Sequence, residues 1–227
     1  MDSFHPVAVD LTDSDSIVRA LTTAEAEAGG FDVLINNAGS GHFGPTEFMP
    51  QEMLRADFQL LVFGQIQMIQ LALRGMRERG SGTIINVSSL AARLPVPFMA
   101  SYNAAKAAMA AFTLSLQLEL GDSKVRFIDL QPADIRTPFN DATVRFAADA
   151  PGYQPKMKKA WLVIDKNMRG APGPELVARR VAELLRVDNP PPQVTVGDVF
   201  QSRVAPLLLR FLPMRVQRWG LRKYYGI

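Results

Sequence analysis

Cysteine is absent from the 227 residues, and the only histidines are His5 and His42. The missing thiols exclude disulfides, cysteine nucleophiles and cysteine-ligated metals. Two histidines disfavour both a histidine metal cluster and a Ser-His-Asp triad. We therefore predict no metal site, and we expect a protein of the reducing cytoplasm.

Charge of one sign and long hydrophobic runs are also scarce. The net charge is only +3, and the basic excess is not interleaved with aromatics except near the end, so nucleic acid is not an expected partner. No signal peptide is evident, and Arg210 and Pro213 interrupt the late leucine cluster, so no membrane-spanning run is expected. At 48% hydrophobic residues, the chain can bury one large core, which predicts a single domain over residues 1–227.

Apolar segments with helical spacing alternate with short apolar runs, which is typical of an α/β fold with a parallel sheet. The helices are expected at about 14–28, 51–79, 102–120 and 172–186, with an irregularity at Gly64 in the second. The strands are expected at about 6–10, 32–39, 82–89, 125–131 and 194–196.

One helix carries the strongest chemical signal. Tyr102 and Lys106 are four residues apart, so they share a helix face, and a neighbouring ammonium would lower the pKa of a phenol. The strand before this helix ends in Ser88 and Ser89, where ligands bind in open parallel sheets. A serine hydroxyl beside an acidic tyrosine suits carbonyl reduction or alcohol oxidation.

Ser88-Ser89, a tyrosine thirteen residues after Ser89 and a lysine four residues later resemble the signature of the short-chain dehydrogenase/reductase family. Asn36-Asn37-Ala38-Gly39 also matches a segment of that family. The resemblance implies a Rossmann-like doubly wound sheet in three α/β/α layers, with NAD or NADP as cofactor. It also implies a homodimer or homotetramer that interconverts a ketone and a secondary alcohol.

The resemblance assigns roles residue by residue. Tyr102 would be the acid/base, Lys106 would lower its pKa and hold the nicotinamide ribose, and Ser89 would stabilise the reacting oxygen. Further residues expected to contact the cofactor are Asp10 and Leu11 near the adenine, Asn37, Ala38 and Gly39 near the adenosine, and Pro132, Ile135 and Thr137 near the nicotinamide.

The sequence departs from the family pattern at several points. The family's first two strands and its Thr-Gly-x-x-x-Gly-x-Gly loop do not precede Asp10, so we expect an N-terminally truncated member whose sheet lacks those strands. Leu61 replaces an asparagine that holds a relay water, and Ala133 replaces a glycine. The 39–44 segment matches a dinucleotide-binding pattern, but Pro45 and Pro50 delay any helix, so we interpret it as an active-site loop.

Two later segments bear on the substrate. Residues 139–170 lack clear periodicity and are rich in aromatics and methionine, which suggests a lid for a small hydrophobic substrate or part of the core. Residues 200–227 carry six basic and no acidic residues among leucines and aromatics. This composition fits a packed helix, a subunit contact, a cover over the substrate mouth or a peripheral contact with an anionic membrane.

Three other interpretations stay open. A sugar-nucleotide epimerase shares the Tyr-x-x-x-Lys pair, although the Asn-Asn-Ala-Gly segment and the Ser89 to Tyr102 spacing disfavour it. A binding or scaffold protein that kept the fold without the chemistry would tolerate Leu61 and Ala133. A lipid-surface protein would use the basic final segment.

Overall fold

The computed structural model describes residues 4–227. The strands are β1 (Val33–Asn36), β2 (His42–Phe43), β3 (Gly82–Val87), β4 (Val125–Pro132), β5 (Val144–Arg145) and β6 (Gln193–Val196). The helices are α1 (Ser14–Ala28), α2 (Gln51–Phe58), α3 (Gly64–Arg79), α4 (Ala100–Glu119), α5 (Phe139–Ala142), α6 (Gln154–Gly170), α7 (Glu175–Leu185), α8 (Ala205–Phe211) and α9 (Met214–Tyr225). Single π-helical turns at Gln59–Phe63 and Phe200–Val204 precede α3 and α8.

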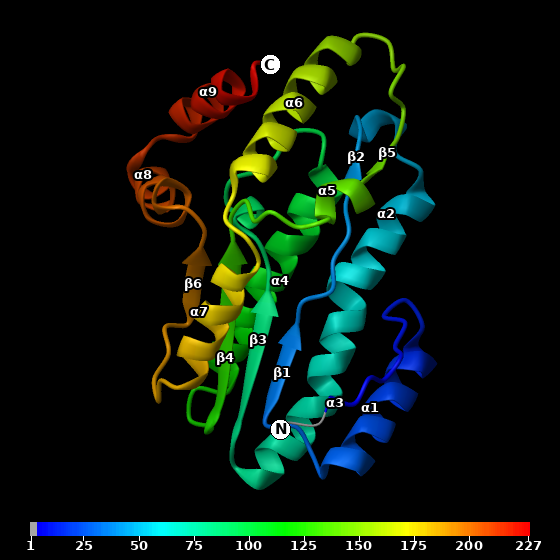
Figure 1. The fold of residues 1–227 in the computed structure, drawn as a ribbon, viewed down its shortest axis with the longest axis vertical. Helices are drawn as coiled ribbons and strands as arrows, with labels where there is room; N and C mark the ends of the chain where they lie inside the picture. The colour runs from blue at the N-terminus through cyan, green and yellow to red at the C-terminus, as the bar shows by residue number, and fades with distance from the viewer. Residues whose placement is uncertain (1–3) are drawn as a thin grey trace.

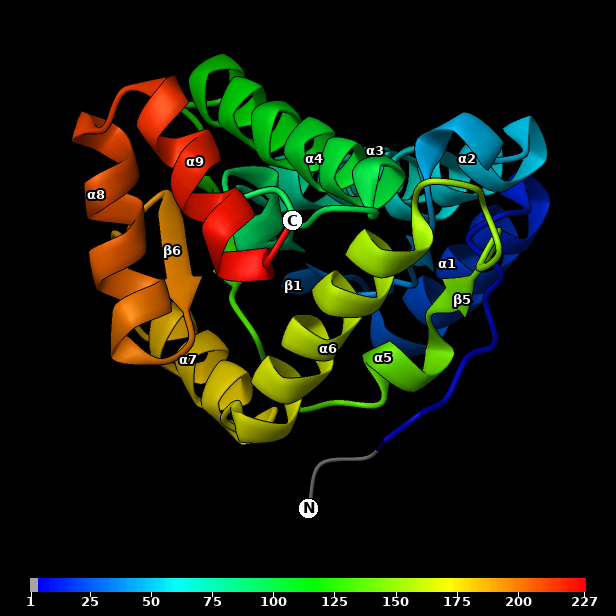
Figure 2. The ribbon, with the colours of Figure 1, turned by 90° about the horizontal axis from the view of Figure 1, so that it is seen from above.

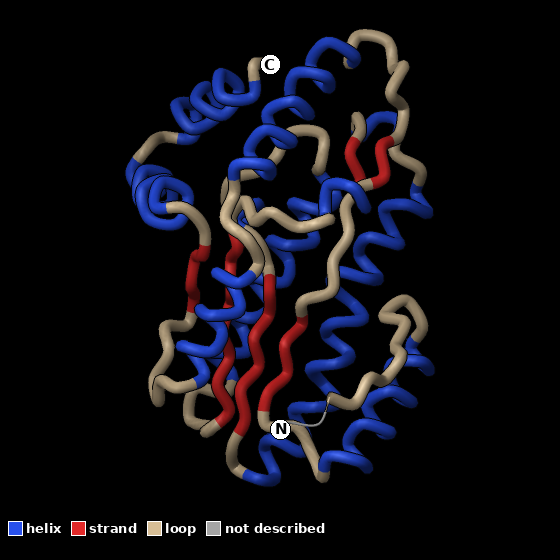
Figure 3. Tube along the Cα trace, viewed as in Figure 1, coloured by secondary structure: helices blue, strands red, loops and turns tan. Residues whose placement is uncertain are grey.

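The main sheet is parallel, with the strand order β1-β3-β4-β6 (Figure 1). Its register pairs Asn36 with Asn86 and Val87 with Leu130. The carboxyl ends of all four strands therefore meet at one edge, which is the upper edge of the four-stranded sheet in Figure 3. In open α/β sheets this edge is where ligands bind.

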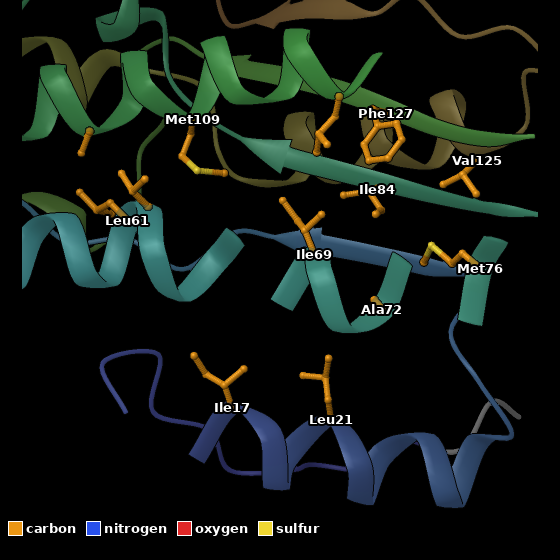
Figure 4. Close-up of a cluster of buried hydrophobic side chains, with 13 residues drawn as sticks. Ile17, Leu21, Leu61, Ile69, Ala72, Met76, Ile84, Met109, Val125 and Phe127 are labelled. Carbon is orange, nitrogen blue, oxygen red and sulfur yellow. The ribbon is translucent and has the colours of Figure 1, made fainter. Parts of the chain in front are cut away.

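Helices cover both faces of the sheet and give the predicted three-layer α/β/α arrangement. On one face, α3 and α4 pack on β3 and β4, with α1 outside α3, through the core cluster drawn in Figure 4. On the other face, α7 packs on β3, β4 and β6 through Leu184. Seen from above, α6, α8 and α9 stand around the carboxyl edge (Figure 2).

Local signals set the ends of α1 as predicted. The Asp13 carboxylate accepts a hydrogen bond of 2.9 Å from the Asp15 backbone N–H and caps the first turn. Gly29 ends the helix in the left-handed conformation, with φ of 74°, which a glycine adopts without the penalty of a side chain.

The predicted strand over residues 6–10 is wrong. These residues form a loop without strand pairing, and most of them are exposed. A strand needs a hydrogen-bonded neighbour, and within residues 4–227 the sheet ends at β1. Val33 and Ile35 on β1 are exposed, and they point away from the α3 and α4 side on which Leu34 packs, at a strand that α7 does not cover.

The long helical stretch from Gln51 to Arg79 contains the predicted irregularity, which lies at Gln59–Phe63, directly before Gly64. A Cβ on Gly64 would lie 2.2 Å from the Leu11 backbone oxygen, so the close crossing of the 11–13 loop requires glycine there. This stretch is also long and apolar enough to cross a membrane by composition, which the sequence interpretation overlooked. Its buried face, including Ile69 and Met76, packs on the sheet as in a core helix.

The segment 139–170 holds more regular structure than predicted. It contains the short α5, the strand β5 paired with β2, and the 17-residue helix α6. The buried positions Met157, Ala160 and Ile164 on α6 follow helical spacing, so the periodicity was present but masked by the polar residues between them.

We predict that Gly64→Ala lowers the free energy of unfolding by about 1–3 kcal/mol, because the new methyl must displace the Leu11 backbone. The matched control is Gly170→Ala at the end of α6, where nothing lies within 4 Å and alanine should stabilise by about 0.5–1 kcal/mol. Urea denaturation of both variants measures the difference. Equal effects of the two substitutions would contradict the close-packing interpretation.

Candidate active site

A cavity of about 1420 Å³ opens at the carboxyl edge of the sheet. Its walls include the ends of β3 and β4, the start of α4, and parts of α6, α8 and α9. The volume exceeds the roughly 300–1,000 Å³ of most small-molecule pockets, so it can hold two ligands side by side.

Ser89, Tyr102 and Lys106 all line this cavity, so the structure brings the three predicted catalytic residues together. Ser89 follows β3, and its hydroxyl hydrogen-bonds to the Tyr102 phenol. The Lys106 Nζ lies 5.9 Å from the centre of the Tyr102 ring, one helical turn away on α4. Side chains from a strand end and a helix N-terminus thus converge on one point.

The pKa of Tyr102 moves opposite to the prediction. Burial raises it above the ordinary value, and the hydrogen bond from Ser89 only partly offsets that effect. The Lys106 ammonium donates a 2.7 Å hydrogen bond to the Val87 carbonyl and is not among the groups that shift the pKa of Tyr102. At neutral pH Tyr102 is therefore protonated, the state of a proton donor.

Lys106 is itself almost fully buried, at 3% exposure. This burial lowers its pKa from the usual range to about 8, while the negative charge of Asp129 opposes the change. The lysine therefore stays mostly charged at neutral pH and loses its proton in mildly alkaline solution.

Asp129 belongs to a buried polar network that the sequence interpretation missed. Its carboxylate accepts hydrogen bonds from the Ser88 hydroxyl, from Gln131 Nε2 at 2.7 Å and from Gln193 Nε2 at 2.9 Å. The donors are the residue directly after β3, one residue of β4 and one of β6, so the network joins three neighbouring chain segments at the sheet. Polar residues at alternate positions 129 and 131 of an apolar strand were the available signal.

A second buried carboxylate, Asp57 on α2, was also missed. It bonds His42 Nδ1 at 2.7 Å and accepts a 2.5 Å hydrogen bond from the Ser101 hydroxyl. Asp57 therefore ties β2, through His42, to the residue directly before Tyr102. His42 does not contact a serine, so these three residues do not form a hydrolytic triad.

The predicted cofactor residues divide into two groups. Those lining the cavity are Asn37, Gly39, Tyr102, Lys106, Pro132, Ile135 and Thr137. Asp10, Leu11 and Ala38 do not line it.

Local contacts account for the three residues outside the cavity. The Asp10 carboxylate accepts hydrogen bonds from the Thr12 backbone at 2.8 Å and the Thr12 hydroxyl at 2.7 Å, which lower the pKa of Asp10. Leu11 packs its backbone over Gly64, and the Ala38 carbonyl accepts from Gln65 Nε2 at 2.9 Å. Their roles toward an adenosine stay predictions.

The two family departures have different structural consequences. Ala133 does not take a positive φ, and its N–H donates to the Val196 carbonyl at 2.7 Å. The replacement of glycine by alanine therefore causes no backbone strain at this position. Gly197 makes room for it, since a Cβ there would lie 2.6 Å from the Ala133 Cβ. Leu61 is fully buried in the core beside α4 and offers no hydrogen bond to a relay water.

The 39–44 segment lies at the cavity and is not followed by a helix that could receive a pyrophosphate. Gly39 lines the cavity, His42 and Phe43 form β2, and the next helical turn, Thr46–Phe48, has only three residues. A Cβ on Gly44 would lie 2.7 Å from the Phe146 ring. Gly44 therefore allows the Phe146 ring to pack closely on the backbone of this segment.

The predicted lid contributes to both the core and the cavity. Phe139 lines the cavity with its ring centre 5.4 Å from that of Tyr102, and Ile164 and Met168 also line it. Trp161 instead packs in the core, with its ring centre 4.9 Å from that of Phe43. Both uses that the sequence left open occur in this segment.

Comparison with known proteins agrees with this geometry. A family model described as short chain dehydrogenase matches residues 1–147. A 3-ketodihydrosphingosine reductase of Bacteroides thetaiotaomicron is 29% identical over 225 residues, covering 97% of this chain and 82% of the relative.

Solved structures are also similar. A short-chain dehydrogenase from Streptomyces avermitilis has a TM-score of 0.78 at 26% identity, covering 94% of this chain and 77% of that one. Serine dehydrogenase complexed with NADP+ has a TM-score of 0.72 at 26% identity, with coverage of 86% and 75%. A Brucella melitensis 3-ketoacyl-(acyl-carrier-protein) reductase complexed with NADH has 0.64 at 26%, with 78% and 69% covered.

We predict that Asp129→Asn lowers the pKa of Lys106 below its value of about 8, because it removes the buried negative charge that favours the ammonium. Carbon NMR titration of the lysine Cε resonances measures this value directly. Asp122→Asn, an exposed carboxylate just after α4, is the control and should leave it unchanged. An unaltered Lys106 titration in Asp129→Asn would show that Asp129 does not act on the lysine.

Proposed function

Because this chain belongs to the short-chain dehydrogenase family and is therefore an NAD(P)-dependent oxidoreductase, we propose that it reduces a long-chain hydrophobic ketone to a secondary alcohol. The observation that carries this proposal is the Ser89–Tyr102 hydrogen bond, with Lys106 one turn away, in the wall of one large cavity. Tyr102 keeps its proton at neutral pH and is therefore ready to donate it, as ketone reduction requires.

The proposed chemistry needs one proton and one hydride. The nicotinamide would supply the hydride to the carbonyl carbon. Tyr102 donates its phenolic proton to the carbonyl oxygen as negative charge develops there, and the Ser89 hydroxyl hydrogen-bonds to the same oxygen. The Lys106 ammonium favours the phenolate that remains until a proton returns from solvent. Leu61 cannot hold water for that return, so we infer a different proton route from the one the family uses.

The residues present fit a nicotinamide dinucleotide. The cavity is large enough for the dinucleotide and a substrate together, and Asn37 and Gly39 line one part while Pro132, Ile135 and Thr137 line another. Thr137 is the polar side chain of the second set. We propose that this second set faces the nicotinamide and that Lys106 holds the adjoining ribose. NAD and NADP both remain candidates.

Apolar residues dominate the rest of the cavity and support a hydrophobic substrate. The apolar residues that line the cavity include Leu94, Val96, Met99, Val177, Leu208 and Trp219. We therefore propose a long acyl or alkyl chain as the bulk of the substrate, which such a surface binds by the hydrophobic effect.

Two carboxylates in the same cavity add a polar feature. Asp134 and Asp198 both line it, and Asp134 accepts a 2.5 Å hydrogen bond from Gln201 Nε2. Burial raises the pKa of Asp134, and the charge of Asp198 adds to that effect. A cationic group near both carboxylates would favour their charged forms, and so would offset both the burial of Asp134 and its repulsion by Asp198. Since the Bacteroides relative is a 3-ketodihydrosphingosine reductase, we propose a long-chain amino ketone of that kind as substrate.

We predict that Tyr102→Phe lowers the turnover of 3-ketodihydrosphingosine by about 10²–10⁴-fold, because the proton donor is lost. Binding of NADH and NADPH, measured by fluorescence titration, should stay nearly unchanged. Tyr153→Phe is the matched control, since this hydroxyl bonds Glu47 at 2.9 Å and the residue does not line the cavity. Full turnover in Tyr102→Phe would refute the assignment, and failure of wild type to bind either dinucleotide would favour a scaffold.

We predict that Asp134→Asn lowers kcat/KM for the amino ketone by about 10–100-fold, the usual loss when a hydrogen bond to a charged group is removed. Reduction of an uncharged long-chain ketone should change less than about twofold. Asp141→Asn on α5 is the control. Parallel losses for both substrates would mean that Asp134 acts on the fold and not on an amine.

A further inference from the structure

The segment formed by Phe200–Val204, α8 and α9 exposes an unusual amount of apolar surface. Val204, Leu207 and Phe211 are spaced by three and four residues, are 39%, 59% and 73% exposed, and do not line the cavity. Such spacing places them on one side of the helical segment. A contiguous exposed apolar stripe of this kind marks an interaction surface.

Cations accompany this stripe. Arg203 and Arg210 are exposed beside it, and Arg215, Arg218 and Arg222 follow at spacings of three and four on one face of α9. Residues 200–227 contain no aspartate or glutamate, so nothing within this segment neutralises the charge. Met214 on α9 is also exposed, and Trp219, which lines the cavity as well, is still 63% exposed with Lys223 Nζ 5.2 Å from its ring centre.

The opposite side of the same helices faces the protein. Leu208 and Leu212 line the cavity from α8 and its end, and Leu221 and Tyr225 line it from α9. Figure 2 shows α8 and α9 side by side at the carboxyl edge, next to α6. The inner side of this segment therefore lines the cavity, and its outer side presents an apolar, cationic surface.

We propose that the outer surface of α8 and α9 docks on an anionic lipid bilayer. The occupant follows from charge complementarity: five arginines and a lysine without a carboxylate match a lipid surface that carries negative charge. Aromatic and aliphatic side chains between the cations would enter the boundary between headgroups and acyl chains. Docking would place the wall of the substrate cavity against the lipid phase.

The docking proposal does not depend on the proposed reaction and is tested without it. The full-length chain is sedimented with vesicles of phosphatidylcholine alone and of phosphatidylcholine mixed with phosphatidylglycerol. We expect binding to the anionic vesicles at least tenfold stronger than to the neutral ones, decreasing as salt is added. Equal binding to both compositions, or no binding to either, would overturn the proposal.

Matched variants distinguish binding through the surface of α8 and α9 from binding through the overall net charge. The triple change of Arg215, Arg218 and Arg222 to Gln should weaken anionic binding about 100-fold, or about fivefold for each arginine. The control changes Arg19, Arg74 and Arg77 to Gln on α1 and α3, which lie at the other end of the sheet in Figure 1, and should change binding less than about twofold. Equal losses in both triple variants would show that overall charge alone explains the binding, and this would overturn the proposal.

The apolar stripe is tested by the double change Leu207→Ser and Phe211→Ser. Binding to anionic vesicles should fall at least tenfold and become fully reversible by salt, while thermal unfolding stays unchanged because both side chains are exposed. Sedimentation velocity without lipid tests the rival occupant. If wild type forms a dimer that this double variant abolishes, a second copy covers the surface and the lipid proposal is wrong.

Discussion

The candidate site depends on one contact, the hydrogen bond from the buried Lys106 ammonium to the Val87 carbonyl. It fixes α4 to the last residue of β3, so that Ser89, two residues beyond the strand, meets Tyr102, one turn before the lysine. A buried ammonium is costly unless a carbonyl or carboxylate offsets its charge. The Val87 carbonyl accepts the hydrogen bond, and Asp129 supplies the opposing charge.

Sequence patterns predicted the elements whose signals are local. The helix at 14–28 was predicted to the residue, because Asp13 and Gly29 mark its two ends, and the strand before Ser89 was predicted because an apolar run led to it. The strand at 6–10 failed because strand formation depends on a neighbour in space, which no local pattern reveals. The Asp57 and Asp129 networks were missed for the same reason: apart from Gln131, their partners lie 15 to 64 residues away.

Chemistry and recognition come from different parts of the chain. The serine, tyrosine and lysine lie on β3 and α4, which pack in the central core. The remaining walls come largely from α6 to α9, joined to each other by fewer buried side chains. This separation explains why the family and its site residues could be read from short motifs, whereas the direction of the Tyr102 pKa and the shape of the cavity could not.

The Asp57 carboxylate has a consequence for how firmly the reacting tyrosine is placed. It bonds both His42 on β2 and Ser101 on α4, so it joins α2, β2 and the first turn of α4. Water hardly reaches this carboxylate, and breaking either bond would leave a buried polar group without a partner. Tyr102, the residue after Ser101, is therefore anchored through three elements although only α4 carries it.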